Sequence, residues 1–159
     1  MSKQPVNLTV SRVIDAPADT IYDLVSDIAR MGEWSPECTG GEWLGDATGP
    51  TVGARFKGTN TAGPNNWSTK PTVTVADRGR EFAFKVPGGS GPTWSYSFEA
   101  VDGGTRVTEQ VSQAKRSPLP IRLLQKRAGI TDRHADLRDK MTTTLDNLAR
   151  VAEGVPAAS

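Results

Sequence analysis

A single carboxylate stands in an otherwise apolar register of one short segment. Val107, Glu109 and Val111 alternate with polar residues, so on a β-strand they share one face. An isolated charge on an apolar face is costly to bury, and Glu109 therefore needs a basic partner or hydrogen bonds. Arg12 and Arg55 are candidate partners; the alternative is that Glu109 lies near a strand edge and reaches water. If it is buried, Glu109 is a candidate acid or base.

The only histidine, His134, is a second candidate for proton transfer. It lies three residues before Leu137 and seven before Met141, in the apolar stripe of a helical segment. Either it faces the interior as a general base, or it is a hydrogen-bonded core residue. One histidine and one cysteine, Cys38, cannot build a zinc site or an intramolecular disulfide. We therefore expect no metal and no other cofactor.

Large aromatic residues repeat with a period of two in neighbouring segments. Trp94, Tyr96 and Phe98 share one face of a strand, and Phe82 and Phe84 repeat the pattern. Such a face is suited either to lining an apolar pocket that holds one or two polar groups, or to filling a core. In a pocket, the Tyr96 hydroxyl is a third candidate for chemistry. With Phe56 and Trp67, the predicted sheet is rich in large aromatic residues: Phe56, Trp67, Phe82, Phe84, Trp94, Tyr96 and Phe98.

The elements that carry these residues predict an α+β fold. Leu8 to Ile14 alternates as a first strand, and Pro17 opens a helical segment that is interrupted near Ser26, which indicates two short helices. An apolar stripe with helical spacing predicts one long helix from Ile121 to about Ala152. Six further strands are expected, at residues 41–44, 54–60, 67–76, 81–86, 93–100 and 105–111.

This order of elements predicts a helix-grip architecture. Consecutive hairpins give a curved antiparallel sheet of seven strands, which wraps around the long C-terminal helix while the two short helices close one end. The length of 159 residues fits one domain. We assign residues 1–153 to that domain and residues 154–159 to a flexible tail.

Composition and charge limit the partners. Nineteen Lys and Arg residues against eighteen Asp and Glu residues give a net charge of +1, so no global field attracts nucleic acid. The segment from Met1 to Val10 has no apolar region, and no stretch approaches the ~20 apolar residues of a membrane span, which predicts a cytoplasmic protein. Residues 112–140 hold eight Lys or Arg and three Asp. This excess indicates transient contact with a membrane surface, an acidic partner or a ligand headgroup, or simply a solvated helix start.

The segment VSRVIDAPADTIYDLVSD at residues 10–27, with the order of elements, resembles the START-like SRPBCC superfamily, also called Bet v 1-like. This superfamily includes polyketide cyclases/dehydrases and lipid-transport proteins. Residues 34–36, 52–58 and 104–109 resemble its small bacterial, particularly actinobacterial, members. The resemblance covers most of the chain but contains no catalytic signature. It implies a cavity between the sheet and the C-terminal helix.

The leading hypothesis is a protein that binds or carries a small hydrophobic molecule, such as a lipid, a fatty acyl chain or a polyketide-like aromatic compound, as a monomer or weak dimer. One alternative is a polyketide cyclase/dehydratase in which Glu109 or His134 moves protons and the Tyr96 hydroxyl or an arginine stabilises an enolate. Another is a regulatory module that docks a protein partner through residues 115–127. The residues expected to line the binding site are Phe56, Trp67, Phe84, Trp94, Tyr96, Glu109, His134 and Met141.

Overall fold

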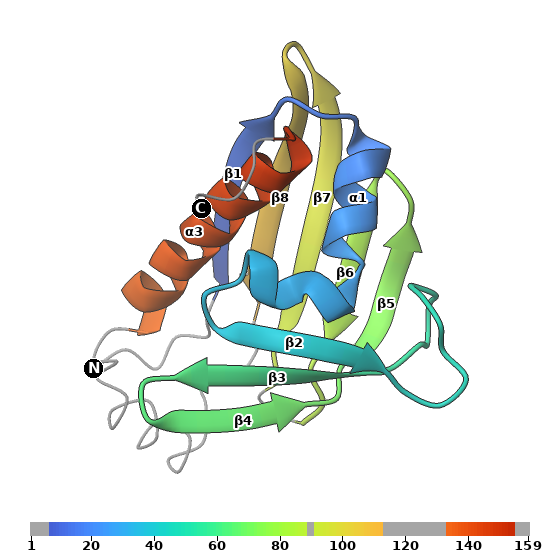
Figure 1. The fold of residues 1–159 in the computed structure, drawn as a ribbon, viewed down its shortest axis with the longest axis vertical. Helices are drawn as coiled ribbons and strands as arrows, with labels where there is room; N and C mark the ends of the chain where they lie inside the picture. The colour runs from blue at the N-terminus through green and yellow to red at the C-terminus, as the bar shows by residue number, and fades with distance from the viewer. Residues whose placement is uncertain (1–6, 89–90, 113–132, 155–159) are drawn as a thin grey trace.

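Two antiparallel sheets form the framework of the computed structural model, which describes residues 7–88, 91–112 and 133–154 (Figure 1). One sheet has five strands in the order β1-β8-β7-β6-β5, and the other has three in the order β2-β3-β4. The strands of the larger sheet are β1 (Asn7–Ile14), β5 (Thr72–Asp77), β6 (Glu81–Lys85), β7 (Thr93–Val101) and β8 (Gly104–Ser112). Those of the smaller sheet are β2 (Cys38–Trp43), β3 (Phe56–Ala62) and β4 (Asn65–Thr69).

The two short helices predicted after the first strand are confirmed as α1 (Ala18–Val25) and the 3-10 helix η1 (Ile28–Glu33). Pro17 precedes α1 in an extended conformation, where its missing N–H costs no helical hydrogen bond. The break falls at Ser26, whose hydroxyl donates to the Tyr22 carbonyl at 2.8 Å. The C-terminal helix is α3 (Arg133–Ala152), and the predicted helical residues 121–132 lie outside the described part of the chain.

The predicted count of seven strands is wrong, because residues 67–76 form two strands that belong to different sheets. β4 pairs with β3, whereas β5 pairs with β6. The division falls at Pro71, which has no N–H to donate to a sheet. The two sheets still meet there: the Phe56 N–H donates to the Pro71 carbonyl, and the Val73 N–H donates to the Ala54 carbonyl. The eight strands thus form a continuous, strongly bent wall.

The helices of the described residues, α1, η1 and α3, lie on one side of the larger sheet (Figure 1). α3 packs on β1 and β8, and α1 packs on β6 and β7, while η1 packs on β2. The prediction of an α+β fold with a curved antiparallel sheet and a C-terminal helix is confirmed. The apolar stripe predicted for α3 is also observed, since Leu137, Met141, Leu145 and Leu148 are all buried.

Replacing Leu148 with Asp should unfold the protein. Leu148 is fully buried in the main core cluster, and an unpaired carboxylate forced against the sheet costs several kcal/mol, a large share of a total stability of ~5–15 kcal/mol. Thermal unfolding followed by circular dichroism measures the effect. Thr143→Asp, on the exposed face of the same helix, is the matched control. Equal melting of the two variants would contradict this packing of α3.

Candidate functional site

Glu109 and Tyr96 form a buried polar pair in the middle of the larger sheet. Glu109 lies on β8 directly between Val10 of β1 and Tyr96 of β7. The Tyr96 hydroxyl donates a hydrogen bond to Glu109 Oε2 at 2.8 Å. Both side chains are on the helix-covered face, with Glu109 3% and Tyr96 6% exposed. The expectation that a buried Glu109 accepts a hydrogen bond is therefore confirmed.

The basic partners predicted for Glu109 are wrong, as is the alternative that it reaches water. Arg12 shares the inward face of β1, but β1 is an edge strand, and there the guanidinium reaches Asp146 of α3 instead. Arg55 is exposed and precedes β3 in the smaller sheet. Among the residues that the structure describes, Glu109 Oε1 is buried without any hydrogen-bond partner. One carboxyl oxygen is thus satisfied by Tyr96, and the other is not satisfied.

Burial decides the protonation state of this pair. It raises the pKa of Glu109 from 4.5 to about 8, against a smaller opposing effect of the Tyr96 hydrogen bond. Burial, and then the neighbouring Glu109, raise the pKa of Tyr96 well above its usual value. Both groups therefore carry their protons at neutral pH. Because Tyr96 donates to Oε2, the proton of neutral Glu109 is available at Oε1, where it has no acceptor among the described residues.

The pair lies where two apolar clusters meet. The larger cluster holds Val107 and the aromatic residues under α1, and the smaller cluster holds Val111. Glu109 stands between these two valines on β8, and both Val10 and Trp94 pack against both clusters. The members of the smaller cluster are Leu8, Val111, Leu137 and Met141. The polar pair thus marks the boundary between a large packed core and a smaller apolar region under the first half of α3.

The aromatic residues predicted to line a pocket divide between these regions. Phe56 and Phe84 pack edge to face, with ring centroids 5.2 Å apart, and belong to the larger core. Trp94 is half-buried at the boundary, next to Val111 in the sheet register. Trp67 is 37% exposed on β4, but it pairs with Asn60 and therefore lies on the same face of the smaller sheet as the buried Phe56.

Two residues of α3 were predicted to join the site. Met141 is fully buried in the smaller cluster. His134 is in the first turn of α3, and its side chain lies outside the described residues. In the first half of α3, the described residues that join the smaller cluster are therefore Leu137 and Met141.

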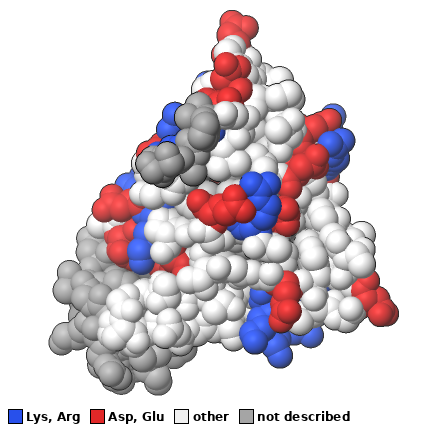
Figure 2. All heavy atoms as spheres, in the orientation of Figure 1, with Lys and Arg blue, Asp and Glu red and all other residues white. Residues whose placement is uncertain are grey.

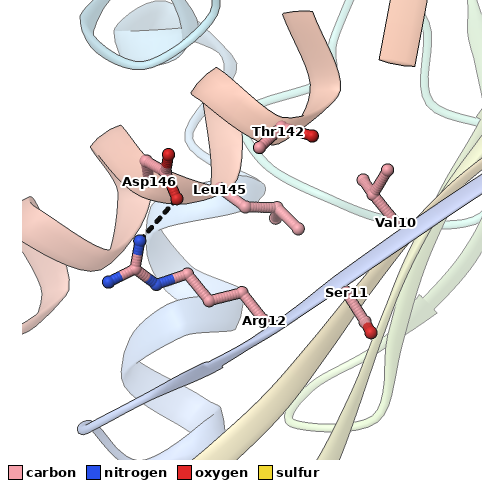
Figure 3. A pocket seen from close by; sticks show the side chains of 6 residues that line it. All are labelled: Val10, Ser11, Arg12, Thr142, Leu145 and Asp146. Atoms are coloured by element: carbon pink, nitrogen blue, oxygen red, sulfur yellow. Dashed lines mark hydrogen bonds and ion pairs between the residues drawn. The ribbon is translucent and has the colours of Figure 1, made fainter. Parts of the chain in front are cut away.

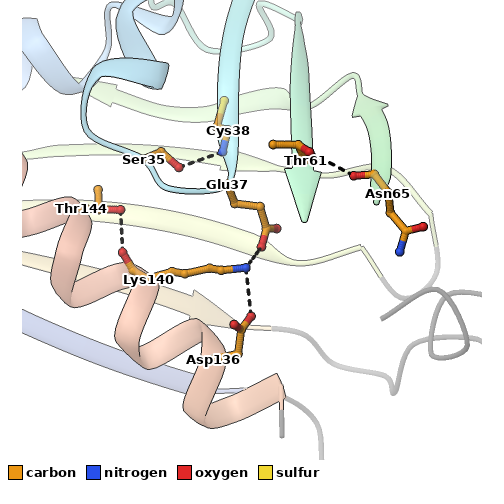
Figure 4. A network of polar contacts seen from close by, with 8 residues as sticks. All are labelled: Ser35, Glu37, Cys38, Thr61, Asn65, Asp136, Lys140 and Thr144. Carbon is orange, nitrogen blue, oxygen red and sulfur yellow. Dashed lines mark hydrogen bonds and ion pairs between the residues drawn. The ribbon is translucent and has the colours of Figure 1, made fainter. Parts of the chain in front are cut away.

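A polar network that the sequence did not reveal holds α3 against the start of β2 (Figure 4). Lys140 Nζ lies 2.9 Å from Glu37 Oε2 and 3.2 Å from Asp136 Oδ2. Asn147 adds a hydrogen bond to the Trp34 carbonyl at 3.1 Å. The i,i+4 spacing of Asp136 and Lys140 is visible in the sequence. The contact between Lys140 and Glu37 is not visible in the sequence, because it joins residues 103 positions apart.

The described surface includes two hollows. One of about 210 Å³ lies between β1 and α3 and is crossed by the Arg12–Asp146 ion pair (Figure 3). Val10 and Leu145 form part of its wall. A second, of about 290 Å³, lies over β2 and β3.

In the view of Figure 2, acidic and basic side chains of the described residues are interspersed. None of the described helices has the length and apolar character to cross a membrane.

The fold and its helix-covered inward face define a Bet v 1-like helix-grip protein. The chain belongs to the polyketide cyclase/dehydrase and lipid transport family, whose sequence profile matches residues 5–153. A search of curated proteins gives no match. The resemblance to the SRPBCC superfamily is thereby confirmed.

Solved structures agree with this assignment. The solution structure of the Polyketide_cyc-like protein Cgl2372 from Corynebacterium glutamicum is 33% identical with a TM-score of 0.63, covering 94% of this chain and 93% of that one. Major latex-like protein 151 from Panax ginseng is 13% identical with a TM-score of 0.70, covering 94% and 98%. The di-domain ARO/CYC protein StfQ from the steffimycin biosynthetic pathway is 15% identical with a TM-score of 0.72, covering 95% of this chain and 51% of StfQ. The last two similarities concern the fold alone.

The buried carboxyl of Glu109 should make the stability of the protein depend on pH. Between pH 4.5 and about 8 the unfolded chain releases the Glu109 proton while the folded protein keeps it. Folding stability therefore falls as pH rises through this window, by a few kcal/mol from this group. Glu109→Gln removes the effect while preserving the shape of the side chain. We expect the variant to gain stability relative to wild type as pH rises.

Chemical denaturation of both proteins across this pH range measures the difference, in which the contributions of the other groups largely cancel. Gln110→Glu, on the exposed face of the same strand, is the control and should follow wild type. A constant difference between Glu109→Gln and wild type at all pH values would show that Glu109 is ionised in the folded protein.

Proposed function

We propose that the protein binds a small hydrophobic ligand between the five-stranded sheet and the first half of α3, as a carrier or binding protein. The observation that carries this proposal is the buried Glu109 oxygen, which faces an apolar surround with no partner among the described residues. A polar atom left in this state costs about 1–3 kcal/mol. A ligand with one polar group on an apolar body would remove that cost and add apolar contacts.

The packing of α3 favours its first half as the place where a ligand enters. Leu145, Leu148 and Ala149, in the second half, belong to the large core. Among the described residues, Leu137 and Met141, in the first half, belong to the smaller cluster and not to the large core. Separating this half from the sheet therefore disturbs fewer apolar contacts, and local opening occurs preferentially where such contacts are few.

The energy of apolar burial is sufficient for useful affinity. At ~25 cal/mol per Å², a ligand that removes a few hundred Å² of apolar surface from water gains several kcal/mol. After the costs of association this corresponds to an affinity near the micromolar range. The family description, which joins lipid transport with cyclase and dehydrase activity, supports a hydrophobic ligand.

Saturable one-to-one binding of an apolar ligand should perturb the emission of Trp94. Fatty alcohols and alkyl ketones that do not absorb with tryptophan are suitable probes, with stoichiometry measured by calorimetry. Trp94→Phe should bind but lose most of the emission change, because Trp94 lies at the boundary next to the proposed site. Trp67→Phe, which removes an exposed ring, should keep it. Absence of saturable binding across a varied panel would contradict the carrier function.

A second candidate function is a cyclase or dehydratase that acts on a poly-β-ketone. The specific observation in its favour is a protonated carboxyl beside a protonated phenol in the interior, since such groups can protonate or stabilise an enolate. The similarity in fold to an ARO/CYC protein is compatible with this candidate.

The two functions differ in how they respond to removal of these groups. In an enzyme, Glu109→Gln and Tyr96→Phe should each lower turnover about a hundredfold or more while binding is largely retained. In a carrier, no turnover is detected in wild type, and ligand affinity changes by less than about tenfold. Product formation from a poly-β-ketone analogue, followed by mass spectrometry, distinguishes them. Turnover that collapses in either folded variant would overturn the carrier function.

A further inference from the structure

The chemistry around Glu109 selects a particular class of hydrophobic ligand. We propose that the ligand carries a neutral oxygen acceptor, a ketone carbonyl or a hydroxyl, which accepts a hydrogen bond from the Oε1 atom of Glu109, and that carboxylate ligands are discriminated against. This inference rests on the proposed function and names the ligand class of the same site.

The geometry supplies a donor and leaves it unused. Tyr96 Oη donates to Oε2 and so fixes the orientation of the carboxyl group. Oε1 is left buried without a partner among the described residues. None of the described cations contacts Glu109, so the neutral acid is the form that this apolar surround tolerates. A neutral carboxyl group oriented in this way presents its O–H at Oε1 and needs an acceptor.

Two described cations on the surrounding elements, Arg12 and Lys140, are already paired within the protein. On β1, Arg12 is paired with Asp146 of α3. On α3, Lys140 contacts both Glu37 and Asp136. The remaining titratable group beside Tyr96 is the Cys38 thiol of β2, whose pKa is raised by burial, so that it is neutral.

A carboxylate entering this region would therefore lose its hydration without gaining Arg12 or Lys140 as a free partner. Its desolvation is more costly than that of a carbonyl or hydroxyl of similar size. A carbonyl oxygen, in contrast, satisfies the Glu109 donor and loses little. The same region thus favours a neutral oxygenated ligand over both its pure hydrocarbon and its carboxylate analogue.

Three naphthalene derivatives of similar size test this selectivity: acetonaphthone, ethylnaphthalene and naphthoate. Calorimetry with the full chain at neutral pH should show acetonaphthone binding about tenfold more tightly than ethylnaphthalene, because only the ketone removes the unsatisfied donor. Naphthoate should bind more weakly than either. Equal affinities for ketone and hydrocarbon would overturn the inference while leaving the proposed carrier function intact. Failure of all three to bind would overturn both.

Variants of Glu109 assign the selectivity to this side chain. Glu109→Leu should abolish the preference for the ketone, and Glu109→Gln, which still offers a donor, should restore it in part. The infrared carbonyl band of bound acetonaphthone should lie at lower frequency in wild type and Glu109→Gln than in Glu109→Leu. Gln110→Leu, on the exposed face of the same strand, is the matched control and should behave as wild type.

A pH profile provides a readout that a purely structural role of Glu109 would not change. From about pH 6 to about pH 9 the preference for the ketone should decline in wild type, as Glu109 ionises and ceases to donate. It should stay constant in Glu109→Gln, whose amide does not titrate. Near-ultraviolet circular dichroism verifies that each variant is folded. A carbonyl band in Glu109→Leu identical to that of wild type, or a pH profile shared by wild type and Glu109→Gln, would overturn the inference.

Discussion

The burial of one carboxyl group with none of the described cations beside it is the constraint on which the interior of this protein depends. Glu109 stands on an otherwise apolar face, between Val107 and Val111, and among the described residues its one hydrogen-bond partner is the neutral Tyr96 hydroxyl. A site arranged purely for stability would hold an apolar side chain here or satisfy both oxygens. Retaining a half-satisfied acid costs folding energy, and such local costs are typical of functional positions.

The architecture isolates this costly position. β8 is an interior strand of the larger sheet, so β1 and β7 shield Glu109 on both sides and α3 packs over β1 and β8. Polar links fasten α3 at other points: Lys140 to Glu37, Asp146 to Arg12 of β1, and Asn147 to the Trp34 carbonyl. Helix α3 is thus held to the sheets at defined places. The smaller apolar cluster under its first half is formed by few of the described residues. With α3 fixed to the sheets in this way, side chains of the smaller cluster can rearrange while the helix and strands keep their places.

Period-two and period-3.6 patterns predicted most of the fold because each sets which side chains face inward. The alternation in β7 and β8 placed Tyr96 and Glu109 on one face correctly, and the stripe of α3 placed Met141 and Leu148 in the core. These patterns contain no information on which strands are neighbours. The adjacency of Tyr96 and Glu109 follows from the hairpin of β7 and β8. The pairing of Arg12 with Asp146 instead of Glu109, in contrast, depends on β1 being an edge strand. Pro71 was the one local signal for the split of residues 67–76, and its effect on the strand count was missed.

Binding and catalysis require different things of the Tyr96–Glu109 pair, and these requirements are the reason that we propose binding. A general acid must exchange its proton during each turnover, so its pKa is best placed near the working pH and a route to water is needed. The pKa of Glu109, about 8, meets the first requirement. The second is not met by the described residues around it, because Val10, Val107, Val111 and Met141 make its surround apolar. A hydrogen bond donated to a resident ligand needs only that the proton stays in place. The same desolvation that slows proton exchange therefore strengthens the hydrogen bond on which selective binding depends.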